Sequence, residues 1–182
     1  MDVYDTIATI LKSNNNMING RTALQKLAYF SKIKIASIEI TSFIHHYYGP
    51  FSREVALALD EMTAFSYIEE RTRPGYSFEG YSYTLTNDGI KFADSAKNKF
   101  QEESKTIFDI VKKCNDFCNL KVKPLSYAAK AYYILTNIEQ GKKEITTEDV
   151  ERVAKKFDWD ISSSDAELGI ELLLKLNLVT VS

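Results

Sequence analysis

The stretch Tyr81-Ser82-Tyr83-Thr84-Leu85-Thr86-Asn87-Asp88-Gly89 decides the fold, because it joins a strand to a helix. Its first five residues alternate with period two, which is typical of a strand with one buried face. Thr86 can then cap a helix, and Asp88 lies in the first turn, where the helix dipole favours a carboxylate. The stretch therefore predicts the second strand of a hairpin, followed directly by a helix.

The residues on either side complete this hairpin and extend the helix. Residues 66–71 read as the first strand, and Pro74-Gly75 marks the turn-rich tip between the strands. After Gly89, apolar residues recur at helical spacing as far as Lys113 without an internal breaker. This pattern predicts one long helix of roughly 25 residues, or about 37 Å.

The residues before the hairpin predict three helices. The first runs to about residue 11 from a cap at Asp2 or Asp5, and the second covers about 22–35. Residues 43–48 form a short β-prone stretch that ends at Gly49-Pro50. Ser52 then caps the third helix. Sparse glycine and proline also favour a helix-rich fold.

The predicted element order resembles a winged helix-turn-helix. Tyr83–Gly89 is similar to the end of the wing in PadR- and MarR-like regulators. The predicted fold class is therefore mainly α with a small antiparallel β-hairpin, in which residues 1–113 form a winged helix-turn-helix-like domain ending in the long helix. A C-terminal helical region follows it.

A second resemblance covers about residues 20–89. Leu24–Phe30, followed by Tyr48–Glu54, is similar to the Panacea-type domain found in antitoxins and to uncharacterised proteins of the YwgA type. These families pair a "QKLxYF"-like helix with a "YGPxS" turn that opens another helix. The resemblance implies a protein partner, such as a toxin, that the domain holds or neutralises.

The turn at Gly49-Pro50 is the predicted partner-binding surface, because aromatic and arginine side chains are enriched in binding hot spots. The side chains displayed there are Tyr47, Tyr48, Phe51 and Arg53. Gln25 and Lys26 are polar residues inside an apolar stretch, so they lie either on the solvated side of a helix or facing the partner. The alternative is that the turn is only a rigid joint between two helices.

Residues 114–182 predict further helices. One begins at Pro124 or Ser126, runs toward Glu139 and stops at Gly141, and a capped helix begins after Thr146. Residues 166–176 form a final helix and residues 178–181 a short strand. This region is interpreted either as a helical layer packed on residues 1–113 or as a second, short helix-turn-helix-like unit.

Catalytic and metal-binding patterns are weak. The sequence contains neither a nucleophile elbow nor a glycine-rich phosphate loop, which argues against an enzyme and against a nucleotide cofactor. His45 and His46 would point to opposite faces of a strand, one buried and one exposed. Cys114 and Cys118 share a helix face and are interpreted as buried core thiols. No metal site or cofactor is expected.

Composition and charge separate the partner classes. The chain has 182 residues, 23 Lys+Arg and 25 Asp+Glu, and its apolar runs are too short to span a membrane. Two cysteines and the acidic residues near the N-terminus indicate a cytoplasmic protein without a signal peptide. Residues 1–113 carry 14 basic and 14 acidic residues, so no dominant basic surface is expected.

The predicted third helix is acidic, since Arg53 is accompanied by Glu54, Asp60 and Glu61. The favoured function is therefore a non-enzymatic regulatory module that binds a protein. The alternative is a DNA-binding transcriptional regulator that uses Arg71 and Arg73 of the wing. A homodimer would form through the long helix after Gly89.

Overall fold

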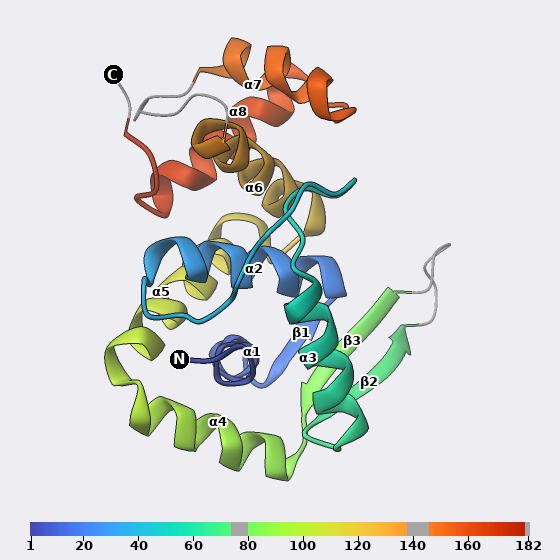
Figure 1. The fold of residues 1–182 in the computed structure, drawn as a ribbon, viewed down its shortest axis with the longest axis vertical. Helices are drawn as coiled ribbons and strands as arrows, with labels where there is room; N and C mark the ends of the chain where they lie inside the picture. Colours follow the sequence, from blue (N-terminus) through green and yellow to red (C-terminus); the bar gives the residue numbers. More distant parts are fainter. Residues whose placement is uncertain (74–79, 138–145, 181–182) are drawn as a thin grey trace.

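The computed structural model describes residues 1–73, 80–137 and 146–180, and it is mainly helical with one small antiparallel sheet (Figure 1). The predicted fold class, mainly α with a small antiparallel β-hairpin, is confirmed. The elements in chain order are α1 (Val3–Ser13), β1 (Met17–Asn19), α2 (Arg21–Lys34), α3 (Arg53–Ala64), β2 (Ile68–Arg73), β3 (Gly80–Leu85), α4 (Asn87–Lys99), α5 (Gln101–Cys118), α6 (Val122–Asn137), α7 (Thr147–Ala154), the 3₁₀ turn η1 (Lys155–Phe157) and α8 (Ser163–Lys175).

The sheet contains the predicted hairpin and one additional strand. β2 and β3 pair antiparallel with Ile68 opposite Leu85, as the period-two pattern predicts. β1 pairs with the other edge of β3, which places Ile18 opposite Tyr83 in a sheet of order β1-β3-β2. The sequence did not predict β1, because three residues are too few for a pattern to show. The predicted tip at Pro74-Gly75 lies outside the described residues.

Side-chain caps form at the four helix starts that the sequence predicted from a capping residue. Asp2, Ser52, Thr86 and Thr146 each accept a hydrogen bond from the backbone N–H three residues further on. The acceptor distances are 2.8, 3.3, 3.1 and 3.2 Å, respectively. Each bond satisfies a donor that the first helical turn leaves unpaired. The helix starts expected at these residues are confirmed.

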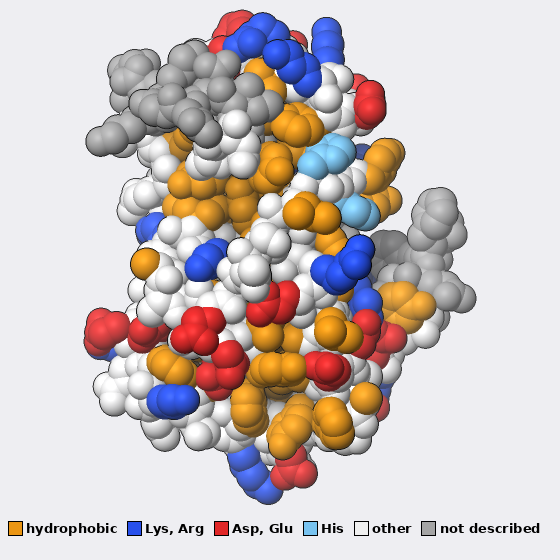
Figure 2. All heavy atoms as spheres, viewed as in Figure 1, with side chains coloured by type: hydrophobic (Ala, Val, Ile, Leu, Met, Phe, Trp, Pro, Cys, Tyr) orange, Lys and Arg blue, Asp and Glu red, His pale blue; other side chains and the backbone are white. Residues whose placement is uncertain are grey.

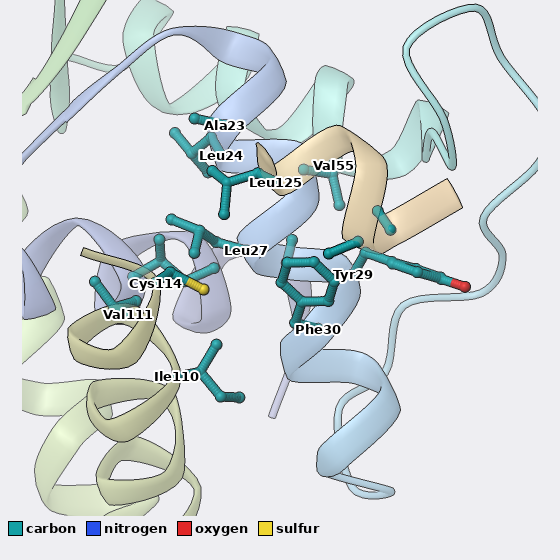
Figure 3. Packing of buried hydrophobic residues seen from close by; sticks show 14 of the residues in the cluster. Ala23, Leu24, Leu27, Tyr29, Phe30, Val55, Ile110, Val111, Cys114 and Leu125 are labelled. Carbon is teal, nitrogen blue, oxygen red and sulfur yellow. The ribbon is translucent and has the colours of Figure 1, made fainter. Parts of the chain in front are cut away.

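The hydrophobic core is built around α1 and α2 and continues into α6. α1 contacts α2, α3, α4 and α5, and α2 also contacts α5 and α6. Figure 3 shows Leu27 and Phe30 of α2 facing α5, where Val111 and Cys114 lie. Cys114 is fully buried, and Cys118 is also a buried free thiol, which confirms their interpretation as core residues.

The prediction of one long helix after Gly89 is wrong. The chain forms two helices, α4 and α5, separated at Phe100, whose backbone leaves the helical region at φ −123° and ψ 63°. Both helices pack against α1, so the break lets the chain turn around that helix (Figure 1). A homodimer built on a single long helix therefore loses its structural basis.

Two predicted strands are absent from the described residues. Within residues 43–48, the only bridge that forms joins Ile44 to Phe51, and no strand is present. Residues 178–180 are also not a strand, while Val181 and the predicted helix stop at Gly141 lie outside the described residues. Both stretches were predicted from β-propensity, which is weak without a neighbouring strand to pair with.

The C-terminal helices gather at one end of the molecule (Figure 1). α6 contacts α2 and α5, and α8 packs closely on α6. A Cβ atom on Gly169 of α8 would lie 2.8 Å from the backbone carbon of Tyr127, so this close approach requires glycine. The division at residue 113 and a second helix-turn-helix unit stay predictions. Among the described helices, none is long and apolar enough to cross a membrane.

Candidate functional site

The segment from Ile44 to Phe51 forms a closed loop between α2 and α3. The backbone N–H groups of Ile44 and Phe51 each donate to the carbonyl of the other residue at 2.9 Å. Inside this loop, the Gly49 N–H donates to the His46 carbonyl at 2.9 Å, and Gly49 adopts φ +91°, a conformation that L side chains rarely take. We refer to residues 44–51 as the 44–51 loop.

Two side chains of α2 hold the exit of the 44–51 loop. Gln25 donates from Nε2 to the Ser52 carbonyl at 2.9 Å and accepts from the Ser52 N–H at 3.0 Å. Lys26 donates from Nζ to the Pro50 carbonyl at 2.6 Å. Gln25 and Lys26 are each only 2% exposed, so they position the loop and do not face a partner or solvent. The prediction that they belong to the binding surface is therefore wrong.

The Lys26 ammonium lies in an unusual environment, because a second buried lysine, Lys130 of α6, is close to it. A Cβ atom placed on Gly49 would lie 3.0 Å from Lys130 Cγ and 3.6 Å from Lys26 Cε. Burial lowers the pKa of Lys26 to about 7, and the Lys130 charge adds to this effect. Burial also lowers the pKa of Lys130, although Asp160 and Asp165 oppose that shift.

Residues near the C-terminus hold the other side of the 44–51 loop. Trp159 donates from Nε1 to the His46 carbonyl at 2.8 Å, and the His45 Nε2 lies 2.9 Å from the Phe157 carbonyl oxygen. The rings of Phe157 and Trp159 stack at 4.8 Å, and the His45 ring stacks on Phe157 at 5.0 Å. Lys130 Nζ lies 5.2 Å from the centre of the Trp159 ring.

The contribution of Phe157 and Trp159 was not predicted, because the sequence pattern showed only a turn there. The signal that could have found it is the single tryptophan, whose indole N–H needs a partner when it is buried. Both histidines are exposed, so the prediction that one is buried is wrong. The reason is that His45 and His46 lie in a loop, where side chains do not alternate between two faces.

The predicted tyrosines are exposed on the 44–51 loop. Tyr47 is 71% exposed and Tyr48 is 51% exposed, and their rings meet edge to face at 4.9 Å. Phe51 is half-buried with its ring 5.1 Å from that of His46, and Arg53 is exposed at the start of α3. Figure 2 shows the two histidine side chains next to hydrophobic side chains on this face.

The arginines of the alternative DNA interface lie on β2, two residues apart and therefore on the same face of the sheet. Arg71 is exposed, but its Nε lies 2.8 Å from a carboxylate oxygen of Glu69. Arg73 is half-buried. At the start of α2, Arg21 pairs with Asp60 of α3 at 2.5 Å and with Glu70 of β2 at 3.5 Å. Each of Arg71 and Arg21 is thus accompanied by acidic side chains.

The structure shows no metal centre in the parts of the chain that it describes. In residues 1–73, 80–137 and 146–180, no three His, Cys, Asp or Glu side chains are close enough together to hold an ion. Burial raises the pKa of both cysteine thiols, so neither is a reactive thiolate.

Comparison with known proteins agrees with the YwgA part of the second resemblance. The chain is similar to YwgA. It is 32% identical over 84 residues to this uncharacterised protein from Bacillus subtilis (strain 168). The match covers 46% of this chain and 50% of YwgA, so the chain spans about half the length of the relative it matches. No protein-family model matches the chain. The Panacea-type and winged-helix resemblances stay predictions.

Proposed function

We propose that this protein is a non-enzymatic regulatory module that binds and neutralises a protein partner in the manner of an antitoxin. The binding surface consists of Tyr47, Tyr48, Phe51 and Arg53. The observation that carries the proposal is the pair of exposed, edge-to-face tyrosines on a loop that is held from both sides by buried side chains.

Preorganisation is the physical reason for choosing this surface. Exposed tyrosine and arginine side chains are the types that dominate binding energy at protein interfaces. Ordering a flexible loop on binding costs free energy, whereas this loop is already fixed by Gln25 and Lys26 on one side and Trp159 on the other. A partner would therefore meet the two tyrosine rings in an arrangement that needs little adjustment.

The same proposal assigns residues 1–113 a winged-helix core. The order α1, β1, α2, α3, β2, β3 and the sheet order β1-β3-β2 support this assignment. In DNA-binding proteins of this type, the helix equivalent to α3 enters the major groove. Here α3 carries Glu54, Asp60 and Glu61, whose charges repel phosphate. The charge on α3 therefore favours a protein partner over DNA.

DNA binding through Arg71 and Arg73 is the second candidate, since Arg71 is exposed on the strand that leads to the wing tip. Filter binding to duplex DNA across a salt series separates the two functions. Retention that falls steeply with salt and is lost in the Arg71→Ala, Arg73→Ala double variant would favour DNA. Absence of retention at low salt would exclude it.

Co-purification with the product of the adjacent gene tests the protein-binding function. The Tyr47→Ser, Tyr48→Ser double variant is expected to weaken a complex by about tenfold or more, because both rings lie in the proposed hot spot. Phe108→Ser is the matched control, since Phe108 is a 38% exposed aromatic residue on α5. A complex that survives the double variant unchanged would show that the surface is assigned wrongly.

A further inference from the structure

A second surface combines exposed aromatic side chains with acidic ones, and it lies at the opposite end of α3 from the 44–51 loop. A hollow of about 340 Å³ is bordered by Tyr4, Phe65, Tyr67 and Phe92, with Met62 among its apolar lining residues. Phe65 is 74% exposed, and Tyr4 and Tyr67 are each 37% exposed. We call this set of five residues the aromatic cleft.

The backbone around the aromatic cleft is held rigidly by the strand-to-helix joint. The Thr86 hydroxyl donates to the Ser66 carbonyl at 2.7 Å, and the Thr86 N–H donates to the Tyr67 carbonyl at 3.1 Å. A Cβ atom on Gly89 would lie 2.0 Å from the Tyr67 carbonyl oxygen, so α4 approaches this turn as closely as glycine allows. The Tyr67 and Phe92 rings then lie 5.5 Å apart.

Carboxylates lie along one side of the aromatic cleft. Asp2 and Glu61 line the hollow, and Glu61 accepts a hydrogen bond from the Tyr4 hydroxyl at 2.5 Å. This bond raises the pKa of the Tyr4 phenol, and the charges of Glu61, Asp2 and Glu54 raise it further. Asp2 and Glu61 are the acids that line the cleft, whereas Glu54 lies in the first turn of α3 and accepts a hydrogen bond from the Thr41 N–H at 2.8 Å. Figure 2 shows acidic side chains beside the hydrophobic ones at this end of the molecule.

These charges decide which kind of partner fits the aromatic cleft. Nucleic acid is unsuitable, because phosphates would meet carboxylates. A second copy docked by the same face would bring Asp2 and Glu61 toward the same acids of its partner, which is unfavourable. A segment that carries lysine or arginine beside large apolar side chains is complementary to the cleft in charge and in hydrophobicity. An amphipathic helix presents such side chains on adjoining faces, and helix-in-groove binding is a recurring mode of peptide recognition.

We propose that the aromatic cleft binds a basic amphipathic helix of a partner protein. The apolar side chains of this helix contact Phe65, Tyr67 and Phe92, and its cations lie against Asp2 and Glu61. This surface is separate from the tyrosines of the 44–51 loop. A result that refutes binding at the aromatic cleft therefore leaves the proposed function of the 44–51 loop untouched, and the reverse also holds.

A synthetic peptide tests the proposal directly. The probe is a fluorescein-labelled helix with leucine at positions i, i+3, i+4 and i+7 and lysine elsewhere, and its matched control has glutamate in place of lysine. Fluorescence anisotropy with the full chain is expected to show binding of the lysine peptide that weakens as salt is added. Equal binding of the glutamate peptide would overturn the proposal.

Two variants locate the binding. Phe65→Ser removes a ring that is mostly in solvent. This change is expected to lower the affinity for the lysine peptide by about tenfold. Glu61→Lys is expected to lower the same affinity by a similar factor. Glu167→Lys is the matched control, because it reverses an exposed charge on α8. Tyr47→Ser is expected to leave this affinity unchanged.

Three results would refute this assignment. The first is binding that neither Phe65→Ser nor Glu61→Lys changes, and the second is an equal loss with Glu167→Lys. The third is a homodimer in sedimentation that Phe65→Ser abolishes, because a second copy would then occupy the cleft. Circular dichroism of each variant confirms that the fold is kept.

Discussion

Replacing Lys26 with methionine is expected to flatten the pH dependence of stability near neutral pH. The Lys26 side chain is 2% exposed, and its ammonium donates to the Pro50 carbonyl without a carboxylate partner among the described residues. Its pKa falls from 10.5 in the unfolded chain to about 7 in the folded protein. Because the unfolded state then binds more protons above pH 7, the wild-type free energy of unfolding rises with pH.

The size of this rise follows from the two pKa values. A full proton difference changes the free energy of unfolding by about 1.4 kcal/mol per pH unit. Between about pH 6.5 and about pH 8.5 the Lys26 contribution integrates to about 2 kcal/mol. At higher pH the buried Cys114 and Tyr29 act in the opposite direction, because burial raises their pKa values and the unfolded state deprotonates first. The measurement therefore ends near pH 8.5.

Urea unfolding at several pH values measures this effect, and the buried Trp159 supplies a fluorescence signal. The Lys26→Met variant is expected to lose most of the rise and to keep only the part that comes from Lys130. Lys34→Met is the control, since Lys34 belongs to the same helix but is only partly buried. Equal slopes for the wild type and Lys26→Met would refute the conclusion that Lys26 is buried as an isolated cation.

Two further predictions concern the joints that hold the surfaces. Gly89→Ala is expected to lower the free energy of unfolding by about 3 kcal/mol, because its Cβ atom would lie 2.0 Å from the Tyr67 carbonyl oxygen. Gly80→Ala is the control for thermal denaturation, since its Cβ atom would lie 4.0 Å from the nearest side chain. Trp159→Phe removes the bond to the His46 carbonyl and is expected to cost about 1 kcal/mol in urea unfolding followed by circular dichroism, because the variant lacks the only tryptophan. An unchanged stability would contradict the role of that bond.

Features that depend on neighbouring residues could be predicted from the sequence. A cap such as Ser52 or Thr86 needs only its own side chain and an N–H three residues away. The hairpin could be predicted because residue types alternate with period two along β3, which indicates a strand with one buried face. The exposure of Tyr47 and Tyr48 also followed from their position beside a glycine–proline turn.

Features that depend on distant residues could not be predicted in the same way. Gln25 and Lys26 are polar, and polar residues in helices usually face water. Their partners are backbone atoms of Pro50 and Ser52, which are more than twenty residues away along the chain. A local sequence pattern does not indicate such a contact. The break at Phe100 is of the same kind, because it contains neither glycine nor proline and follows from packing both helices on α1.

Helix α3 sets the relation between the two proposed surfaces. It begins beside the 44–51 loop, where Gln25 holds Ser52, and it ends beside the aromatic cleft, where Thr86 and Gly89 fix the turn after Phe65. Its twelve residues span about 18 Å. Because both ends are fixed by buried contacts, a partner that touches both surfaces would bind at a set spacing without ordering either one. Binding at one end would then leave the geometry of the other unchanged, so the affinities of the two surfaces should be independent of each other.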